Sequence, residues 1–358
     1  MYTKARVLSF YLPQFHTIPE NDLWWGKGFT EWTNVRKAKP LFEGHEQPII
    51  PGELGFYDLR NPEIREMQAQ MANDHGIEGF CYWHYWFGND KRLLELPFNE
   101  VLSSGKPDFP FCLAWANETW SGVWHGKPKR ILIKQEYPGL DDYIKHFEFV
   151  VSAFRDNRYI TVKGKPVFII YRPLDIPDIK QMMELWRKLS LENHLTGIHF
   201  VAHTTNYDKE IKQLEMLGFD GIINNTFKKA HQKLEMNVIA RKVFNLIGRT
   251  PNIYDYETFA NYLLDENDQK PGVYPTVIPN WDNSPRSGTK GIIIKGSTPD
   301  LFEKHINKAI KLIEKKEYDD NLVFIKSWNE WAEGNYMEPD NKYGLQYLEV
   351  IKNHFEKV

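Results

Sequence analysis

The sequence predicts an α/β fold, a single (β/α)8 TIM barrel with long loops over its carboxyl-terminal face. Eight short apolar runs, rich in β-branched and aromatic residues, have the length and composition of buried strands. Amphipathic helical patterns separate these runs, which is the alternation expected of parallel strands joined by helices. The chain has 358 residues, more than the roughly 250 that such a barrel typically needs, so the surplus should lie in loops.

The expected strands follow one another with room for a helix between them. They are residues 7–12, 77–82, 109–115, 167–171, 198–203, 219–224, 274–278 and 322–327. The clearest helical patterns are residues 62–74, 141–154, 178–193, 298–315 and a closing one at 344–355. The longest loops, residues 13–60 and 225–254, each follow a strand, which places them on the face where these barrels hold their active sites. One domain over residues 1–358 is expected.

Composition excludes several classes of protein. A net charge of -3 lacks the basic footprint of a nucleic-acid binder, so no nucleic-acid partner is expected. No apolar run approaches the roughly 20 residues of a transmembrane helix, although peripheral membrane association and the oligomeric state are left open. The first residues lead directly into a strand and carry no export signal, which predicts a cytoplasmic location.

The sequence gives no indication of a metal or cofactor. The two cysteines, Cys81 and Cys112, lie inside apolar strands and are expected to be reduced packing residues rather than a disulfide or zinc ligands. No His-Glu-x-x-His spacing appears, and no Gly-rich phosphate loop or Asp-x-Asp motif of the kind many nucleotide-sugar transferases carry. We therefore expect no bound metal and no cofactor.

Aromatic residues make up 15% of the chain, including 12 tryptophans, and many stand beside His, Asn and Glu. Tryptophan faces stack on the C–H faces of sugar rings, while polar neighbours bind the hydroxyl groups. A single tryptophan more often packs in the core, but the clusters together favour a carbohydrate-binding cleft.

Aromatic and polar residues of this kind lie directly after seven of the eight expected strands, where a barrel enzyme holds its active site. Any one of them could equally cap a helix or close a loop, whereas seven strand ends together indicate a site. The candidates for substrate binding are Tyr11, His16, Trp83, His84, Trp115, Asn117, Glu118, Tyr171, Arg172, Trp281 and Asn329.

The last strand ends in two carboxylates, Glu330 and Glu333, set between tryptophans. If the chain turns helically after Asn329, residues at i and i+3 share a face and both carboxylates point at one ligand. Close like charges raise the pKa of one of them, which separates an acid from a base. Spacing alone is equally compatible with two solvated loop glutamates.

Four sequence blocks stand out, namely YLPQFH at 11–16, WGKGFTEW at 25–32, WANE at 115–118 and WNEWAEG at 328–334. Together they resemble the WbsX-like family of glycosyltransferases from bacterial surface polysaccharide loci, whose barrel is similar to that of glycoside hydrolase family 99, the endo-α-mannosidases. The resemblance covers nearly the whole chain, and the four blocks together are highly specific.

The resemblance implies that Glu330 and Glu333 are catalytic. Glu330 would act as base on the sugar 2-hydroxyl, closing a 1,2-anhydro intermediate, and Glu333 would serve as acid and then as base. This differs from the usual retaining scheme, in which a carboxylate bonds the sugar directly, and the residues alone do not choose between the two. Ala332 departs from the family 99 pattern, which often has His between the glutamates, so the resemblance does not fix the substrate contacts near this turn or strict mannosidase activity.

The sequence therefore favours a retaining, endo-α-mannosidase-like glycosidase that acts on an α-linked polysaccharide or oligosaccharide. The missing nucleotide motifs rank hydrolysis above sugar-nucleotide transfer. The alternatives are a glycosyltransferase of O-antigen or capsule (lipopolysaccharide) biosynthesis and a non-catalytic sugar-binding barrel.

Overall fold

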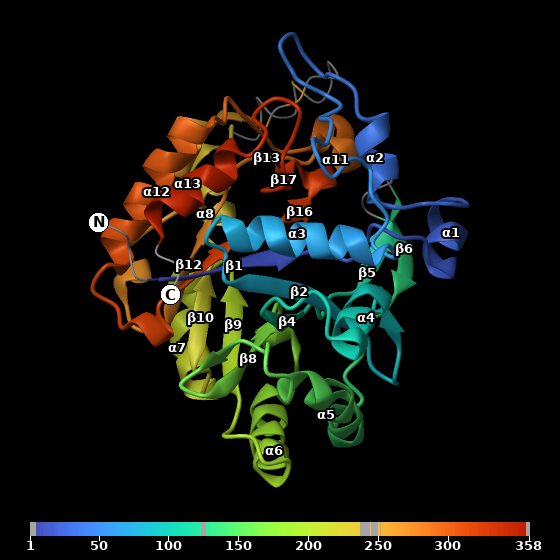
Figure 1. Ribbon diagram of the computed structural model, residues 1–358, viewed down its shortest axis with the longest axis vertical. Helices are drawn as coiled ribbons and strands as arrows, with labels where there is room; N and C mark the ends of the chain where they lie inside the picture. Colours follow the sequence, from blue (N-terminus) through green and yellow to red (C-terminus); the bar gives the residue numbers. More distant parts are fainter. Residues whose placement is uncertain (1–4, 123–126, 237–243, 245–249, 251, 356–358) are drawn as a thin grey trace.

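The computed structural model describes residues 5–122, 127–236, 244, 250 and 252–355, and the eight expected strands form one closed parallel barrel in it (Figure 1). β1 pairs with β15 on one side and with β2 on the other, which closes the sheet. The barrel strands are β1 (Arg6–Tyr11), β2 (Gly79–Trp86), β4 (Phe111–Trp115), β8 (Lys165–Ile170), β9 (His199–Thr204), β10 (Gly221–Asn224), β12 (Val273–Val277) and β15 (Leu322–Ile325). The predicted fold class is confirmed, with β2 extending further than expected and β15 ending two residues earlier.

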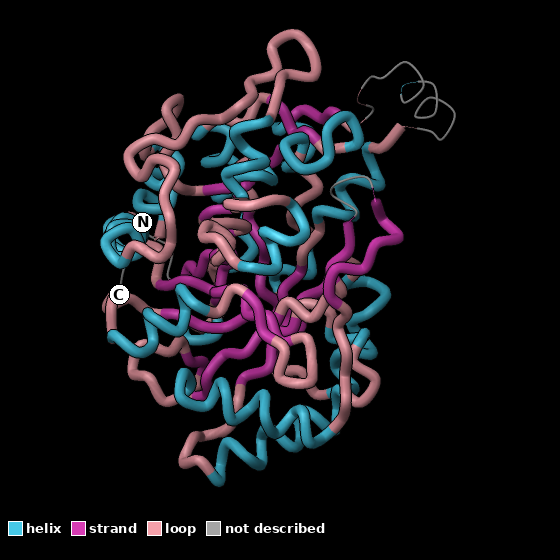
Figure 2. Tube along the Cα trace, turned by 90° about the vertical axis from the view of Figure 1, so that its right-hand side faces the viewer, coloured by secondary structure: helices cyan, strands magenta, loops and turns pink. Residues whose placement is uncertain are grey.

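Helices surround the strands on the outside of the barrel (Figure 2). The five predicted helices are present, and α3 begins and ends at the predicted residues. Its start is set by Asn61, whose side chain accepts a hydrogen bond from the Glu63 amide, and by Pro62 in the first turn. The helices of this layer are α3 (Pro62–Asp74), α4 (Leu96–Ser104), α5 (Leu140–Phe154), α6 (Ile179–Glu192), α7 (Tyr207–Leu217), α12 (Pro299–Ile313) and α13 (Gln346–His354).

The surplus residues form short elements, most of them in the loops that follow the barrel strands. In Figure 1 the arrows of β9 and β10 point up towards several of these elements, including β13, β16 and α11. The long loop after β1 contains two helices, and the predicted loop at 225–254 contains α8 and lies partly outside the described residues. These elements are α1 (Pro19–Trp25), α2 (Glu31–Lys37), β3 (Arg92–Leu93), β5 (Trp120–Gly122), β6 (Lys127–Ile133), β7 (Thr161–Val162), α8 (Phe227–Leu234), β11 (Ile253–Asp255), α10 (Tyr256–Ala260), β13 (Trp281–Asp282), α11 (Ser284–Ser287), β14 (Ile293–Lys295), β16 (Asn329–Glu330), η6 (Trp331–Glu333) and β17 (Asn335–Tyr336).

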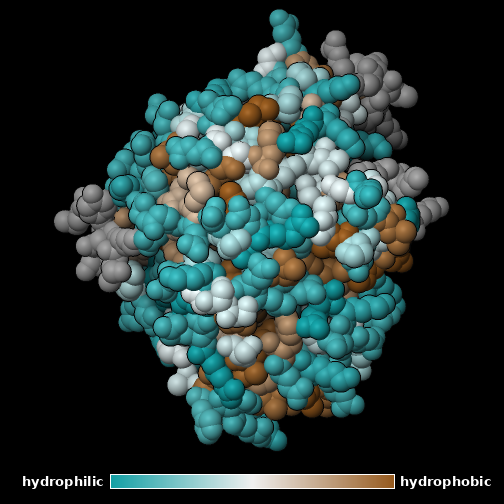
Figure 3. All heavy atoms as spheres, turned by 45° about the vertical axis from the view of Figure 1, so that its right-hand side comes forward, coloured by the Kyte–Doolittle hydropathy of each residue, from teal (hydrophilic) through white to brown (hydrophobic). Residues whose placement is uncertain are grey.

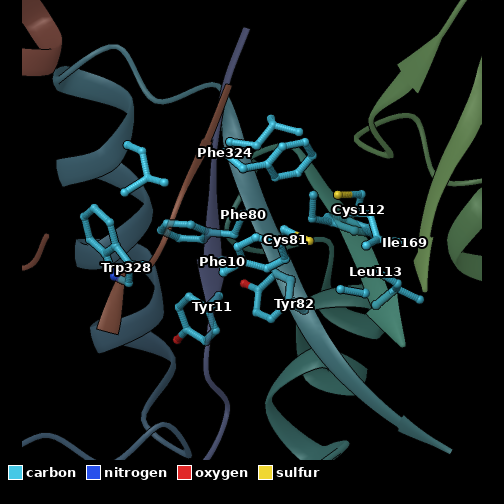
Figure 4. Packing of buried hydrophobic residues seen from close by; sticks show 14 of the residues in the cluster. Phe10, Tyr11, Phe80, Cys81, Tyr82, Cys112, Leu113, Ile169, Phe324 and Trp328 are labelled. Carbon is cyan, nitrogen blue, oxygen red and sulfur yellow. The ribbon is translucent and has the colours of Figure 1, made fainter. Parts of the chain in front are cut away.

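The barrel interior is filled by side chains, so the barrel is a core rather than a pore. Phe10 stacks on Trp83 with ring centroids 4.7 Å apart and on Phe324 at 5.5 Å. Figure 4 shows Cys81 and Cys112 side by side in this packing, where they are register partners on β2 and β4. The outer surface drawn in Figure 3 is mainly hydrophilic, with apolar atoms gathered in a few places. Among the described residues, no helix combines the length and the apolar character that crossing a membrane requires.

Both cysteines are free and fully buried, and burial raises the pKa of the Cys81 thiol. We predict that a thiol-specific reagent labels neither of them in the folded protein, because the reactive thiolate is both inaccessible and disfavoured. After denaturation without reductant, the same reagent should label both. Fewer than two labelled thiols in the denatured protein would show that the cysteines had been oxidised.

Candidate active site

The two glutamates lie on a tight turn, residues 328–334, which we call the two-glutamate turn. β16 pairs antiparallel with β17, and the chain between them forms a single 3-10 turn that ends at Glu333. Gly334 closes the turn with a φ of 55°, and a Cβ atom there would lie 2.7 Å from the backbone N and O of Asp282. Only glycine combines this backbone conformation with this close approach. The helical turn expected after Asn329 is therefore present.

One guanidinium, that of Arg286, contacts three carboxylates. Its Nη1 lies 2.8 Å from Glu333 Oε1, and its Nη2 lies 3.2 Å from Glu330 Oε2 and 2.9 Å from Glu31 Oε2. All three glutamates are more than nine-tenths buried. Arg286 belongs to α11 and Glu31 begins α2, so the cluster joins three loops that are distant in sequence. The paired arrangement of Glu330 and Glu333 is thus fixed by a shared cation.

A second cation, Lys326, stands directly after β15. Its ammonium lies 3.9 Å from Glu333 Oε2 and 5.0 Å from the centroid of the Trp281 ring. Burial opposes a charge on Lys326, but the nearby glutamates outweigh burial and raise its pKa. Glu333 is therefore held between two cations.

The pKa of Glu330 is raised to about 7. Burial is the largest cause, and the negative charge of Glu333 adds to it, whereas Arg286 and Lys326 act in the opposite direction. A carboxyl group with a pKa near 7 can both release and accept a proton at physiological pH, which is what acid–base catalysis needs.

Part of this cluster lines a cleft of about 370 Å³ with aromatic walls. The charged part of its surface comes from Glu31, Glu118, Arg286 and Glu330. The aromatic part comes from Trp25 and Phe29 in the loop after β1, from Tyr85 near the end of β2 and from Trp120 after β4. The cleft thus places aromatic faces beside clustered carboxylates, the combination expected for binding a sugar.

Several of the predicted binding residues lie at or near this cleft. Glu118 lines it and pairs with Arg172, whose Nη2 lies 2.9 Å from Glu118 Oε1. Trp83 and Tyr171 meet edge to face with ring centroids 5.4 Å apart, at the carboxyl-terminal end of the barrel interior. Burial raises the pKa of the Tyr171 hydroxyl, and nearby Lys326 lowers it.

The structure places four other predicted residues away from the cleft. Tyr11 donates to Gln68 of α3 at 2.7 Å, His84 contacts His146 of α5, and the Trp115 indole donates to the Trp86 carbonyl. Successive strand residues point to opposite sides of a sheet, so these side chains face the helices while their neighbours face the barrel axis. His16 is buried as well, and burial lowers its pKa.

Two predicted asparagines are buried bridges between loops. Asn329 accepts from the Leu12 amide at 2.7 Å and donates to the Leu12 carbonyl at 3.0 Å, which ties the two-glutamate turn to the end of β1. Asn117 makes the same kind of two-way link to the backbone of Arg172. Trp281, the last predicted residue, lines a second cavity rather than the cleft.

Sequence reasoning missed Glu31, Arg286 and Lys326. Glu31 lies within the WGKGFTEW block, and Lys326 is the first charged residue after an apolar strand, so each left a signal. Arg286 left none, because only the folding of α11 over the barrel brings it to the glutamates. Among the described residues, no group of three His, Cys, Asp or Glu side chains is arranged to hold a metal ion.

A buried fourth carboxylate, Glu338, supports the turn from behind. It accepts hydrogen bonds from the Trp331 indole at 2.5 Å, the Gln68 amide at 2.6 Å and the Tyr57 hydroxyl at 2.9 Å. Burial raises the pKa of Glu338 to about 7, although these hydrogen bonds lower it. Glu338 therefore fixes Trp331, the residue that follows Glu330.

A closed (β/α)8 barrel with an acid-lined aromatic cleft at the carboxyl ends of its strands defines the class of protein, a carbohydrate-active enzyme. The chain belongs to the family described as Glycosyltransferase WbsX, whose profile matches residues 7–351. It is 35% identical over 351 residues to the uncharacterized protein WxcX of Xanthomonas campestris pv. campestris. The aligned region covers 97% of this chain and 49% of that protein. The chain thus spans about half the length of the curated relatives it matches.

Two solved structures share the fold at low sequence identity. A glycoside hydrolase-like protein superposes with a TM-score of 0.65 at 16% identity, over 99% of this chain and 95% of that one. The GH99 endo-alpha-mannosidase of Bacteroides thetaiotaomicron superposes with a TM-score of 0.59 at 15% identity, over 97% and 95%. Both likenesses extend over nearly the whole barrel.

We predict that the unfolding free energy of Glu338→Gln, measured relative to that of the wild type, increases as the pH rises from about 5 to about 8. In the wild type the folded carboxyl keeps its proton up to about pH 7, whereas the unfolded chain loses it above its ordinary pKa of 4.5, so rising pH costs folding free energy. Glutamine has no proton to lose, and the difference in unfolding free energy should grow by about 1–3 kcal/mol.

Denaturant unfolding at several pH values measures this difference. Glu257→Gln, at an exposed glutamate that pairs with Lys304, is the matched control and should show little pH dependence. A Glu338→Gln difference that stays constant or shrinks with pH would contradict a raised pKa at Glu338.

Proposed function

We propose that the chain is a retaining glycosidase-like enzyme that cleaves α-linked bonds in a mannose-type or related polysaccharide or oligosaccharide. The observation that carries the proposal is the pair Glu330 and Glu333, held by one guanidinium beside an aromatic cleft. The printed name of the GH99 neighbour, an endo-alpha-mannosidase, is the reason for proposing a mannose-type substrate.

In the proposed reaction Glu330 takes the proton of the sugar 2-hydroxyl, whose oxygen attacks the anomeric carbon and closes a 1,2-anhydro ring. Glu333 gives a proton to the departing glycosidic oxygen as that bond breaks. Water then opens the ring, losing its proton to Glu333 while Glu330 returns the first proton to the 2-oxygen. A pKa near 7 suits Glu330 to this exchange, because a base works best when its pKa lies near the ambient pH.

The cations beside the pair have a separate role in this proposal. Two carboxylates close together resist ionising at the same time, so one proton tends to remain between them. Arg286 and Lys326 lie against this pair and offset part of that repulsion. A pair of carboxyl groups that shares one proton can then act as one acid and one base.

A glycosyltransferase is the second candidate, and the description of the matching family favours it. The same residues would serve, with an acceptor hydroxyl in place of water in the second step. Incubation with sugar nucleotides plus acceptor, and separately with defined α-manno-oligosaccharides, distinguishes the two. Transfer without hydrolysis would reverse the ranking, and binding without turnover would leave only the non-catalytic barrel. The cytoplasmic location, the single domain and the lack of a nucleic-acid partner stay predictions.

We predict that Glu330→Gln and Glu333→Gln each lower turnover by about 10²–10⁴-fold, because each removes a proton-transferring group. Sugar binding, measured by calorimetry with the same oligosaccharide, should survive, since glutamine keeps the shape and one acceptor oxygen. Glu257→Gln should retain full turnover. Unchanged turnover in either active-site variant would remove that residue from the mechanism.

We predict that turnover rises with pH through an apparent pKa near 7, because Glu330 must be ionised to act as base. Arg286→Gln should move this limb to higher pH, since losing a neighbouring cation raises the pKa of a carboxyl group. Arg155→Gln is the control, because Arg155 is exposed at the end of α5 and donates hydrogen bonds to Asn193, away from the glutamates. The melting temperature should first show that Arg286→Gln is folded. If the rise of turnover with pH then stays at the same pH as in the wild type, ionisation of Glu330 is not its cause.

A further inference from the structure

A second cavity of about 570 Å³ adjoins the two-glutamate turn and is larger than the cleft. Glu330 lines the cleft, whereas Gly334 and Tyr336, from the same turn and the strand after it, line the second cavity. Among the described residues, none lines both. The second cavity is bounded by the loop of residues 42–50 and by β13, β14, β17 and the start of α13, parts of which are visible in the upper half of Figure 1.

Aromatic side chains form much of its lining. Trp281, Tyr336, Tyr343 and Tyr347 all contribute, and Tyr343 meets Tyr347 at 89° with ring centroids 5.5 Å apart. Tyrosine and tryptophan combine an apolar face with a polar edge, so they can pack against a sugar ring and bind its hydroxyl groups. The volume lies within the usual range for sites that bind small molecules.

The lining carries charged groups of both signs: Asp282 and Asp340 are buried, whereas Glu46, Lys295 and Lys342 are exposed. Asp282 accepts hydrogen bonds from His45 at 2.7 Å, Gln47 at 2.6 Å and the Ser284 amide at 2.9 Å. Asp340 accepts from the Tyr336 hydroxyl at 2.7 Å and from the backbone amides of Lys342 at 2.9 Å and Tyr343 at 2.6 Å. An ionised carboxylate can accept about four hydrogen bonds, so these contacts use most of the acceptor capacity of both groups and hold them in place in the lining. Because acidic and basic side chains both line the cavity, and Lys342 pairs with Glu46 at 2.7 Å, the lining has no strong excess of either charge and suits neutral hydroxyl groups.

The cavity is also physically connected to the two glutamates. Tyr336 stacks on Trp331, which directly follows Glu330, with ring centroids 3.9 Å apart and planes 9° from parallel. The backbone amide of Tyr336 donates a hydrogen bond to the side chain of Asn280, the residue before β13. A ligand in the second cavity would therefore lie on the same face of the barrel as the cleft and one aromatic layer from the turn.

We propose that the second cavity binds a neutral sugar unit, separate from the one that reacts, and so holds a further part of a polysaccharide chain near the cleft. The choice of a sugar rests on the proposed function. The residues that define this site are Trp281, Asp282, Tyr336, Asp340, Tyr343 and Tyr347.

The test measures ligand binding at each site by the fluorine NMR signal of a tryptophan that lines it. In the inactive Glu333→Gln protein labelled with 5-fluorotryptophan, Trp281 reports on the second cavity and Trp120 on the cleft. Their fluorine resonances are assigned with Trp281→Phe and Trp120→Phe. The probes are α-linked oligosaccharides of mannose, glucose, galactose and rhamnose, together with inorganic phosphate.

Ile50→Phe fills the mouth of the second cavity, since Ile50 lines it and is 40% exposed. Leu191→Phe, at a position 62% exposed on α6, is the matched control. We expect at least one sugar to shift the Trp281 resonance in the parent and in Leu191→Phe, and the shift to be lost in Ile50→Phe. The Trp120 shift should persist in all three.

Three results would overturn the proposal: no sugar moves Trp281, Ile50→Phe leaves its shift intact, or phosphate moves it while the sugars do not. Failure of the proposed function would look different. In that case Trp120 would respond to no sugar, whatever Trp281 does.

Discussion

The shared guanidinium of Arg286 is the interaction on which the site depends. Three buried glutamates would repel one another, and a buried charge without a partner is costly. Arg286 suits this position because its planar fork offers several N–H groups in fixed directions, which a lysine ammonium cannot reproduce. Its contacts with Glu31, Glu330 and Glu333 hold together loops that follow three different barrel strands. The arginine thus organises the cleft as well as balancing its charge.

Around this cluster, polar contacts position the glutamates from behind. Asn329 fastens the turn to the end of β1, and Glu338 holds the Trp331 indole. These groups are buried and do not line the cleft. Side chains that are fixed by hydrogen bonds beneath a site keep the reacting groups within the narrow geometry that catalysis needs. The barrel strands supply the rigid base for this arrangement.

The direction in which each strand residue points, towards the barrel axis or towards the helices, explains which predicted residues reach the site. Trp83 and Tyr171 face the barrel axis, whereas His84 and Trp115 face the helices. A strand end alone does not indicate whether a residue points inward, because adjacent residues point to opposite sides. The chemistry of the site is thereby concentrated in the loops, and the second cavity shows that these loops build more than one pocket on this face.

The sequence by itself determined the barrel and its eight strands, because hydrophobic periodicity is a local property of the chain. It pointed to Glu330 and Glu333 only through their spacing together with the family resemblance. It also indicated a sugar cleft through its clustered aromatic residues. Only the tertiary structure decided that Arg286, Lys326 and Glu31 surround the pair, that Tyr11 and His84 turn away from it, and that Trp281 lines a separate cavity. Those facts depend on how loops far apart in sequence fold over the barrel, and no local pattern encodes contacts between such distant segments.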